Sequence, residues 1–77
     1  LPVVTIEHAE AAVPLAQALL RGGLSAIEVT LRTPAALQSI ECIAAEVPQI
    51  AVGAGTVLNS RDLEAARRAG ARFALSP

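Results

Sequence analysis

The sequence predicts an α/β fold of parallel strand–helix units in the order β-α-β-α-β-α-β, the N-terminal half of a (β/α)8 barrel. Short β-branched apolar segments begin about 25 residues apart and alternate with segments of helical apolar spacing. Strands that alternate with helices in this way form parallel sheets. The second strand also carries one apolar and one polar face, which separates a barrel from other parallel sheets.

The first unit is a strand near residues 1–6 followed by a helix near residues 10–21. The segment LPVVTI is short, apolar and β-branched, as a strand buried in a parallel sheet is. Pro14 lacks an amide hydrogen and fits a helix only within the first turn, which agrees with a start near residue 10. Gly22 and Gly23 end the helix because glycine readily adopts the left-handed conformation of a C-cap.

The second unit is a strand near residues 26–31 and a helix near residues 34–47. Thr33 is the expected N-cap and Pro34 the expected first helical residue, since proline at that position loses no hydrogen bond. Pro48 stops the helix because it cannot continue the hydrogen-bonding pattern.

The third unit is a strand near residues 50–53 and a helix near residues 60–69. Asn59 is the expected N-cap of this helix, and Gly70 ends it. A fourth strand is expected near residues 72–76. No linker or low-complexity tract divides the sequence, so residues 1–77 are expected to form a single partial barrel domain.

The second strand favours the barrel over the alternative, a small doubly wound sheet. One face of this strand is apolar and carries Ile27, Val29 and Leu31. The other face is polar and carries Glu28, Thr30 and Arg32. Both faces of a doubly wound sheet lie under helices, where stacked polar side chains are costly to bury. The inner face of a barrel points at its axis, and active sites lie at the C-terminal mouth.

Composition excludes several classes of function. The chain is 53% hydrophobic and 17% charged with a net charge of −1, so it is globular and has no basic surface for nucleic acid or an anionic membrane. No apolar run reaches the ~18 residues of a membrane span. The single cysteine, Cys42, cannot form an internal disulfide, which favours the cytoplasm. One His and one Cys are too few for a zinc site built from soft ligands, and no metal is expected.

Glu28 and Arg32 are the groups on the polar face that are suited to chemistry. A carboxylate inside a barrel can act as a general acid or base. A guanidinium at the carboxyl end of a strand can hold a carboxylate or phosphate through two parallel hydrogen bonds. A separation of roughly 13 Å along the strand argues against a direct pair. A structural ion network inside the barrel is the alternative.

The third strand runs into Gly53, Gly55 and Thr56. Glycines at alternating positions remove side chains from one face and let a ligand or another chain segment approach the backbone. The dinucleotide-binding motif is not formed, because Leu58 stands where its third glycine belongs. Thr56 offers a hydroxyl for a ligand, and a tight bend with a solvated threonine is the alternative.

Three strings resemble, in order, the N-terminal half of 2-keto-3-deoxy-6-phosphogluconate (KDPG) aldolase, which also acts on 4-hydroxy-2-oxoglutarate (KHG). They are IEVTLRT at 27–33, VGAGTVL at 52–58 and FALSP at 73–77. The resemblance covers essentially the whole chain. It implies a (β/α)8 barrel, a trimer, a cytoplasmic enzyme, and class I chemistry on a keto acid, in which a lysine forms a Schiff base with pyruvate and no metal or other cofactor is needed.

The resemblance also assigns roles to residues of the chain. It implies that Glu28 is the general acid/base, which moves protons through water, and that Arg32 and Thr56 hold the pyruvyl carboxylate. The family's lysine and phosphate-binding loops belong to later strands, and this chain contains no lysine. We therefore expect the chain alone to be inactive.

Two other hypotheses remain open at this point. In the first, the chain is a non-catalytic half-barrel, which is stable as a scaffold or through self-association across its two unpaired sheet edges. In the second, it is part of another barrel enzyme with similar strand ends.

Overall fold

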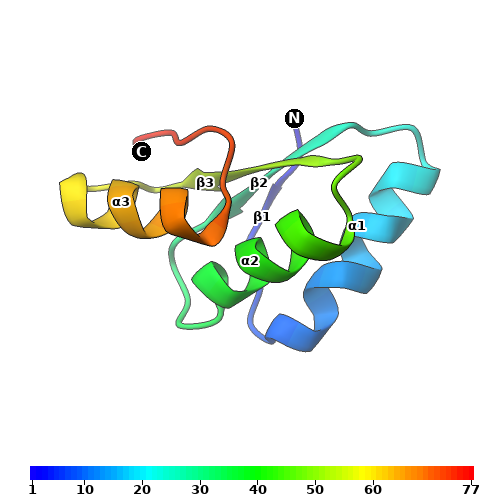
Figure 1. Cartoon of the computed structure of the whole chain (residues 1–77), viewed down its shortest axis with the longest axis horizontal. Helices are drawn as coiled ribbons and strands as arrows, with labels where there is room; N and C mark the ends of the chain where they lie inside the picture. The colour runs from blue at the N-terminus through cyan, green and yellow to red at the C-terminus, as the bar shows by residue number, and fades with distance from the viewer.

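The computed structural model describes all residues of the chain, 1–77, as a parallel sheet with helices between its strands (Figure 1). The elements are β1 (Val3–Val4), a 3-10 helix η1 (Ala9–Ala11), α1 (Ala12–Arg21), β2 (Ala26–Thr30), α2 (Ala36–Glu46), β3 (Ala51–Gly55) and α3 (Ser60–Ala69). The strands lie side by side in the order β1-β2-β3, and both pairings are parallel. The predicted α/β fold of parallel units is confirmed.

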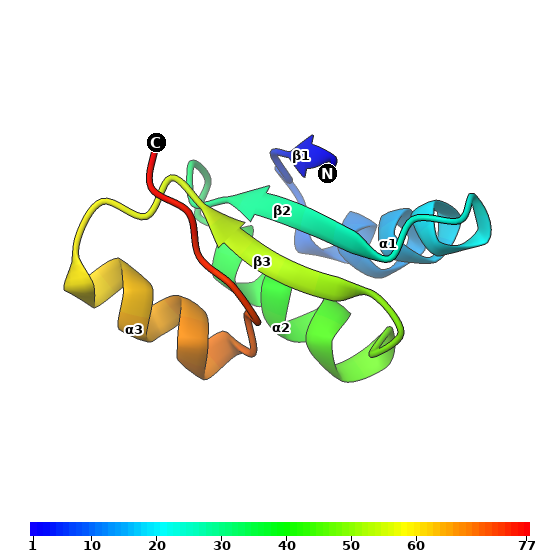
Figure 2. The same ribbon diagram turned by 90° about the horizontal axis from the view of Figure 1, so that it is seen from above.

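All three α-helices lie on one side of the sheet, and α2 is the central one (Figures 1 and 2). Apolar strand residues turn toward the helices and are almost fully buried: Ile27, Val29, Val52 and Ala54. They pack in one core with Ile40 and Ile43 of α2. Burying these side chains is the main force that holds sheet and helices together.

The opposite face of the sheet, which we call the helix-free face, carries Val3 and Thr5, Glu28 and Thr30, and Gly53 and Gly55. Register places Val3 beside Glu28 and Glu28 beside Gly53, so these residues point to the same side. A doubly wound sheet would have helices on both faces. The doubly wound alternative is therefore wrong, and the polar face of β2 avoids burial under helices as the sequence indicated.

The first and last strands are shorter than the sequence predicted. β1 pairs only through Val3 and Val4 instead of residues 1–6, because it is an edge strand with β2 as its single neighbour. The segment at 72–76 forms one isolated bridge, between Ala54 and Ala74, although four backbone hydrogen bonds join it to β3 and the residues beyond. This segment also has a neighbour on one side only, and a regular ladder does not form.

The helix of the second unit does not begin as the sequence predicted. Thr33 is not its N-cap and Pro34 is not helical; α2 begins at Ala36, and Ala35 in the N-cap position makes no side-chain cap. The reason is a competing bond: the Thr33 hydroxyl donates to the carbonyl oxygen of Ile6. Thr33 thereby joins the end of β2 to the end of β1 instead of capping the helix.

The third helix begins and ends as its residue types indicate. The Asn59 side chain accepts a hydrogen bond of 2.8 Å from the amide of Asp62, and the Asp62 carboxylate accepts one of 3.2 Å from the amide of Leu58. Gly70 ends the helix with φ 106°, a left-handed conformation that suits glycine. No helix of the chain is both long enough and apolar enough to span a membrane.

Candidate active site

Glu28 lies at the middle of β2 on the helix-free face and is half-buried. Its register partner on β3 is Gly53, but its side chain reaches diagonally to Gly55. A Cβ added to Gly55 would overlap the Oε2 of Glu28 and would stand 2.6 Å from its Cδ. The carboxyl group therefore lies directly against the backbone of β3, displaced toward the carboxyl end of both strands.

Arg32 and Thr56 meet at that same end. The Nε of Arg32 donates a hydrogen bond of 3.3 Å to the Oγ1 of Thr56. The two terminal amino groups of Arg32 have no hydrogen-bond partner in the chain, and they are free to bind an anion. Because Thr56 follows Gly55 directly, the structure gathers Glu28, Arg32 and Thr56 into one locality, which the sequence predicted only as three separate candidates.

Thr56 has an unusual backbone conformation. Its φ is 59°, and it is the only residue other than glycine with a positive φ. The left-handed region is strained for a β-branched residue, and such strain is found preferentially at functional sites. Here it accompanies the turn of the chain after β3 and the contact between the Thr56 hydroxyl and Arg32.

Glu28 and Arg32 do not form an ion pair. The salt bridges of the chain join Glu64 to Arg67 and Arg68, on the surface of α3. Glu28 and Arg32 therefore take part in no ion network among residues 1–77. The carboxylate and the guanidinium remain available for a ligand.

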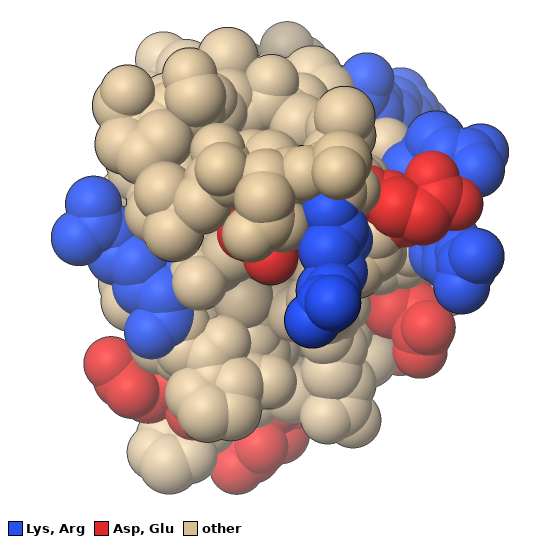
Figure 3. Space-filling model, turned by 90° about the vertical axis from the view of Figure 1, so that its left-hand side faces the viewer, with Lys and Arg blue, Asp and Glu red and all other residues tan.

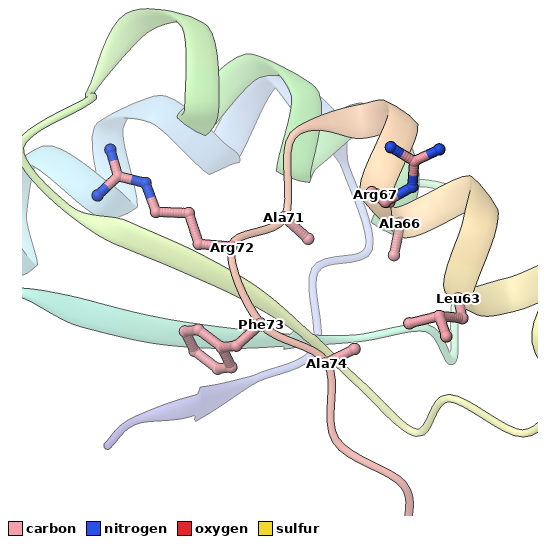
Figure 4. Close-up of a pocket in the computed structure, with 7 residues that line it drawn as sticks. All are labelled: Leu63, Ala66, Arg67, Ala71, Arg72, Phe73 and Ala74. Atoms are coloured by element: carbon pink, nitrogen blue, oxygen red, sulfur yellow. The ribbon is translucent and has the colours of Figure 1, made fainter.

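Two further residues of the helix-free face, Thr5 and Phe73, were not identified as site residues from the sequence. The hydroxyls of Thr5 and Thr30 share a hydrogen bond of 2.9 Å, which ties β2 to the segment after β1. The ring of Phe73 lies over Gly53, on the side of the strands away from the helices (Figure 4). Two features of the sequence could have indicated the contact between Phe73 and Gly53. Gly53 and Gly55 alternate along the strand, and Phe73 is the only aromatic residue of the chain.

The surface at the carboxyl ends of the strands is mostly uncharged (Figure 3). One acidic group there is largely covered by neighbouring atoms and lies beside a projecting basic side chain. A separate hollow between α3 and the segment 71–74 is lined by Leu63, Ala66, Arg67, Ala71, Arg72, Phe73 and Ala74 (Figure 4). It contains none of the candidate residues. No group of three or more His, Cys, Asp or Glu side chains is placed to hold a metal ion.

Comparison with known proteins assigns the chain to a family. The family model described as KDPG and KHG aldolase matches residues 1–77, the entire chain. The chain belongs to the KDPG and KHG aldolase family. The family resemblance drawn from the three sequence strings is confirmed.

Curated members of this family are similar to the chain over its whole length. The KHG/KDPG aldolase of Escherichia coli K12 is 53% identical over 76 residues, which are 99% of this chain and 36% of that protein. The 2-dehydro-3-deoxy-phosphogluconate aldolase of Zymomonas mobilis is 53% identical over 77 residues, 100% of this chain and 36% of that protein. The chain therefore spans little more than a third of these aldolases.

Solved structures of the family agree with the fold. The aldolase of Zymomonas mobilis ZM4 with 3-phosphoglycerate has a TM-score of 0.91 and 54% identity, covering 99% of this chain and 36% of that one. The KDPG aldolase of Legionella pneumophila, with pyruvate captured as a covalent carbinolamine intermediate, has a TM-score of 0.94 and 46% identity, with 99% and 37% covered. The parallel units thus match a portion of barrel aldolase structures.

Proposed function

We propose that residues 1–77 supply the proton-transfer and carboxylate-binding groups of a class I aldolase. This enzyme cleaves KDPG to pyruvate and glyceraldehyde 3-phosphate, and cleaves 4-hydroxy-2-oxoglutarate to pyruvate and glyoxylate. The observation that carries the proposal is the position of the Glu28 carboxyl group. It lies on the helix-free face, near the carboxyl ends of β2 and β3, beside an Arg32–Thr56 pair with free guanidinium donors.

Each of these groups has a role that its position supports. Arg32 would bind the carboxylate of the keto acid through its two unpaired amino groups, and the Thr56 hydroxyl would donate a further hydrogen bond. Glu28 would move protons to and from the carbon–oxygen centre next to that carboxylate, through a bridging water. No ion pair within residues 1–77 engages its carboxylate.

The nucleophile must come from outside these residues. The carbinolamine in the Legionella pneumophila structure joins pyruvate covalently to an amine. This chain has no lysine, and a class I aldolase needs an amine of lowered pKa as its nucleophile. We therefore place that lysine, and the site for the substrate phosphate, in the portion of the enzyme that residues 1–77 do not cover. The imine formed from the lysine withdraws electrons during cleavage, and the proposal requires no metal or other cofactor.

The substrate and the setting of the enzyme are extensions of the same proposal. The relatives' names specify phosphorylated and unphosphorylated keto acids, which agrees with a site built around a carboxylate. We further propose that the whole enzyme is a trimer, as the family resemblance implies. The unpaired Cys42 agrees with a reducing compartment, and we place the enzyme in the cytoplasm.

A fusion enzyme tests this proposal. In it, residues 1–77 replace the matching segment of the Escherichia coli KHG/KDPG aldolase, which supplies the remaining portion. The fusion enzyme should release pyruvate from KDPG, whereas residues 1–77 alone should show none above background. A folded fusion enzyme without pyruvate release would contradict the proposal, and so would turnover by the isolated chain.

A further inference from the structure

Gly53 and Gly55 are placed where the chain's own side chains occupy the space that a Cβ would fill. Neither has a positive φ, so their backbone conformations do not demand glycine. Space does: at Gly53 a Cβ would overlap the ring of Phe73, and at Gly55 it would overlap the carboxyl group of Glu28. Each glycine thus leaves space for one neighbouring side chain, an aromatic ring at Gly53 and a carboxyl group at Gly55.

The two contacts have different physical consequences. The Phe73 ring presents three atoms to Gly53, all within overlap distance of a Cβ, so the whole ring would have to move. At Gly55 the atom that a Cβ overlaps most is Oε2, the far end of a flexible side chain, while Cδ would be at 2.6 Å and Cγ at 2.9 Å. Rotation of Glu28 relieves that overlap at small cost in stability, but it moves the carboxyl group.

We propose that Gly55 is a positioning residue for Glu28. By leaving space on the helix-free face, it lets the carboxyl group lie against the backbone of β3, next to Thr56 and its partner Arg32. The inference rests on the proposed function, because the position of this carboxyl group affects turnover only if Glu28 transfers protons. Displacement of a reacting group by about 1 Å can lower a rate by about 100-fold.

The test is a double-mutant cycle in the fusion enzyme. Gly55→Ala should lower kcat for pyruvate release by about 10- to 100-fold, with KM and the unfolding temperature nearly unchanged. Glu28→Ala shortens the side chain and removes the overlap. In that background, Gly55→Ala should change the remaining turnover by less than about threefold, because interacting residues are not additive. Equal losses from Gly55→Ala in both backgrounds would overturn the inference.

Two control variants separate positioning from packing. Gly53→Ala should lower the unfolding temperature in both Glu28 backgrounds, and Phe73→Ala, not Glu28→Ala, should relieve that loss. Gly22→Ala should have little effect, since its Cβ would meet nothing nearer than the carbonyl oxygen of Leu19 at 3.4 Å.

A stability measurement keeps the inference testable apart from activity. If Gly55→Ala prevents folding, Glu28→Ala must restore it, and failure to restore folding would overturn the inference. If the fusion enzyme releases no pyruvate, the proposed function fails. The coupling of Gly55 to Glu28 is then read from the NMR chemical shift of the Glu28 carboxyl carbon, which reports the surroundings of that group. Gly55→Ala should change this chemical shift while Gly53→Ala should not, and an unchanged chemical shift in Gly55→Ala would overturn the inference.

Discussion

Arg32 stands just beyond the last residue of β2, with one guanidinium nitrogen held by Thr56 and two others free. This hydrogen bond engages the Nε of the guanidinium and leaves the two terminal nitrogens as donors for a carboxylate. A lysine has a point charge on a flexible stem and cannot reproduce that geometry.

Arg32→Lys should therefore weaken substrate binding in the fusion enzyme. We expect KM for KDPG to rise about 10- to 100-fold, the equivalent of one charge-assisted hydrogen bond of about 1.5–3 kcal/mol. Steady-state measurement of pyruvate release checks this. Arg61→Lys is the matched control, since Arg61 is exposed on α3 and makes no side-chain hydrogen bond. An unchanged KM in Arg32→Lys would remove Arg32 from the binding of the carboxylate.

At the residue scale the sequence predicted which face each side chain would take, but not which side chains would meet. Strict alternation along β2 was sufficient to place Glu28 and Thr30 on one face, whereas Arg32 lies beyond the end of the strand. The meeting of Glu28 with Gly55 depends on a rotamer and on strand register, neither of which periodicity reveals. The glycines suggested close approach by a ligand or another segment, and the structure shows that two side chains of the chain itself approach them.

The third helix is held at its start by reciprocal bonds between side chains and backbone. Asn59 accepts from the amide of Asp62, an amide that has no partner within the helix. Asn59→Ala should lower the free energy of unfolding of the fusion enzyme by about 1 kcal/mol. Chemical denaturation checks this value. Asn59→Asp should retain most of the stability, because a carboxylate caps equally well, and a loss as large as that of Asn59→Ala would contradict the capping role.

The same helix carries a pH-dependent ion pair. The hydrogen bond from Arg67 lowers the pKa of the Glu64 carboxyl group below its ordinary value of 4.5. Since the pKa is lower in the folded state, the stabilisation is present above pH 4.5 and is lost as the pH falls through the folded value. The two groups are exposed, so the effect is small.

Glu64→Gln should consequently lower the unfolding temperature slightly at neutral pH, and the difference should vanish at a pH well below the folded-state pKa of Glu64. The comparison with the unchanged fusion enzyme is made by thermal unfolding at a series of pH values from neutral downward. A difference that persists at the lower pH would show that Glu64 acts through packing instead of charge.

At the element scale, local signals predicted α3 better than the sheet edges. Asn59 and Gly70 act within the helix that they delimit, so residue type alone identified its ends. Thr33 has the same capping chemistry as Asn59, yet it bonds to Ile6, a residue distant in sequence. The segment at 72–76 has strand-forming residues, but a regular strand needs neighbours that its own sequence does not specify.

The whole molecule is a sheet covered by helices on one side only (Figure 2). Its core is complete on the helix side, where Ile27 and Val52 are buried, while Val3 on the helix-free face is 59% exposed. In the solved aldolases that the chain matches, it spans about 36–37% of the polypeptide. We propose that the rest of the barrel encloses the helix-free face in the complete enzyme, so that its polar groups form an interior site there.

The most direct measurement is the turnover of Glu28→Gln in the fusion enzyme, because glutamine keeps the size of the side chain and removes its ability to transfer a proton. We expect an unchanged unfolding temperature and a loss of about 100- to 10,000-fold in the rate of pyruvate release from KDPG. Glu41→Gln, an exposed change on α2, should have no effect. Turnover of Glu28→Gln equal to that of the unchanged fusion enzyme would contradict the assignment of proton transfer to Glu28.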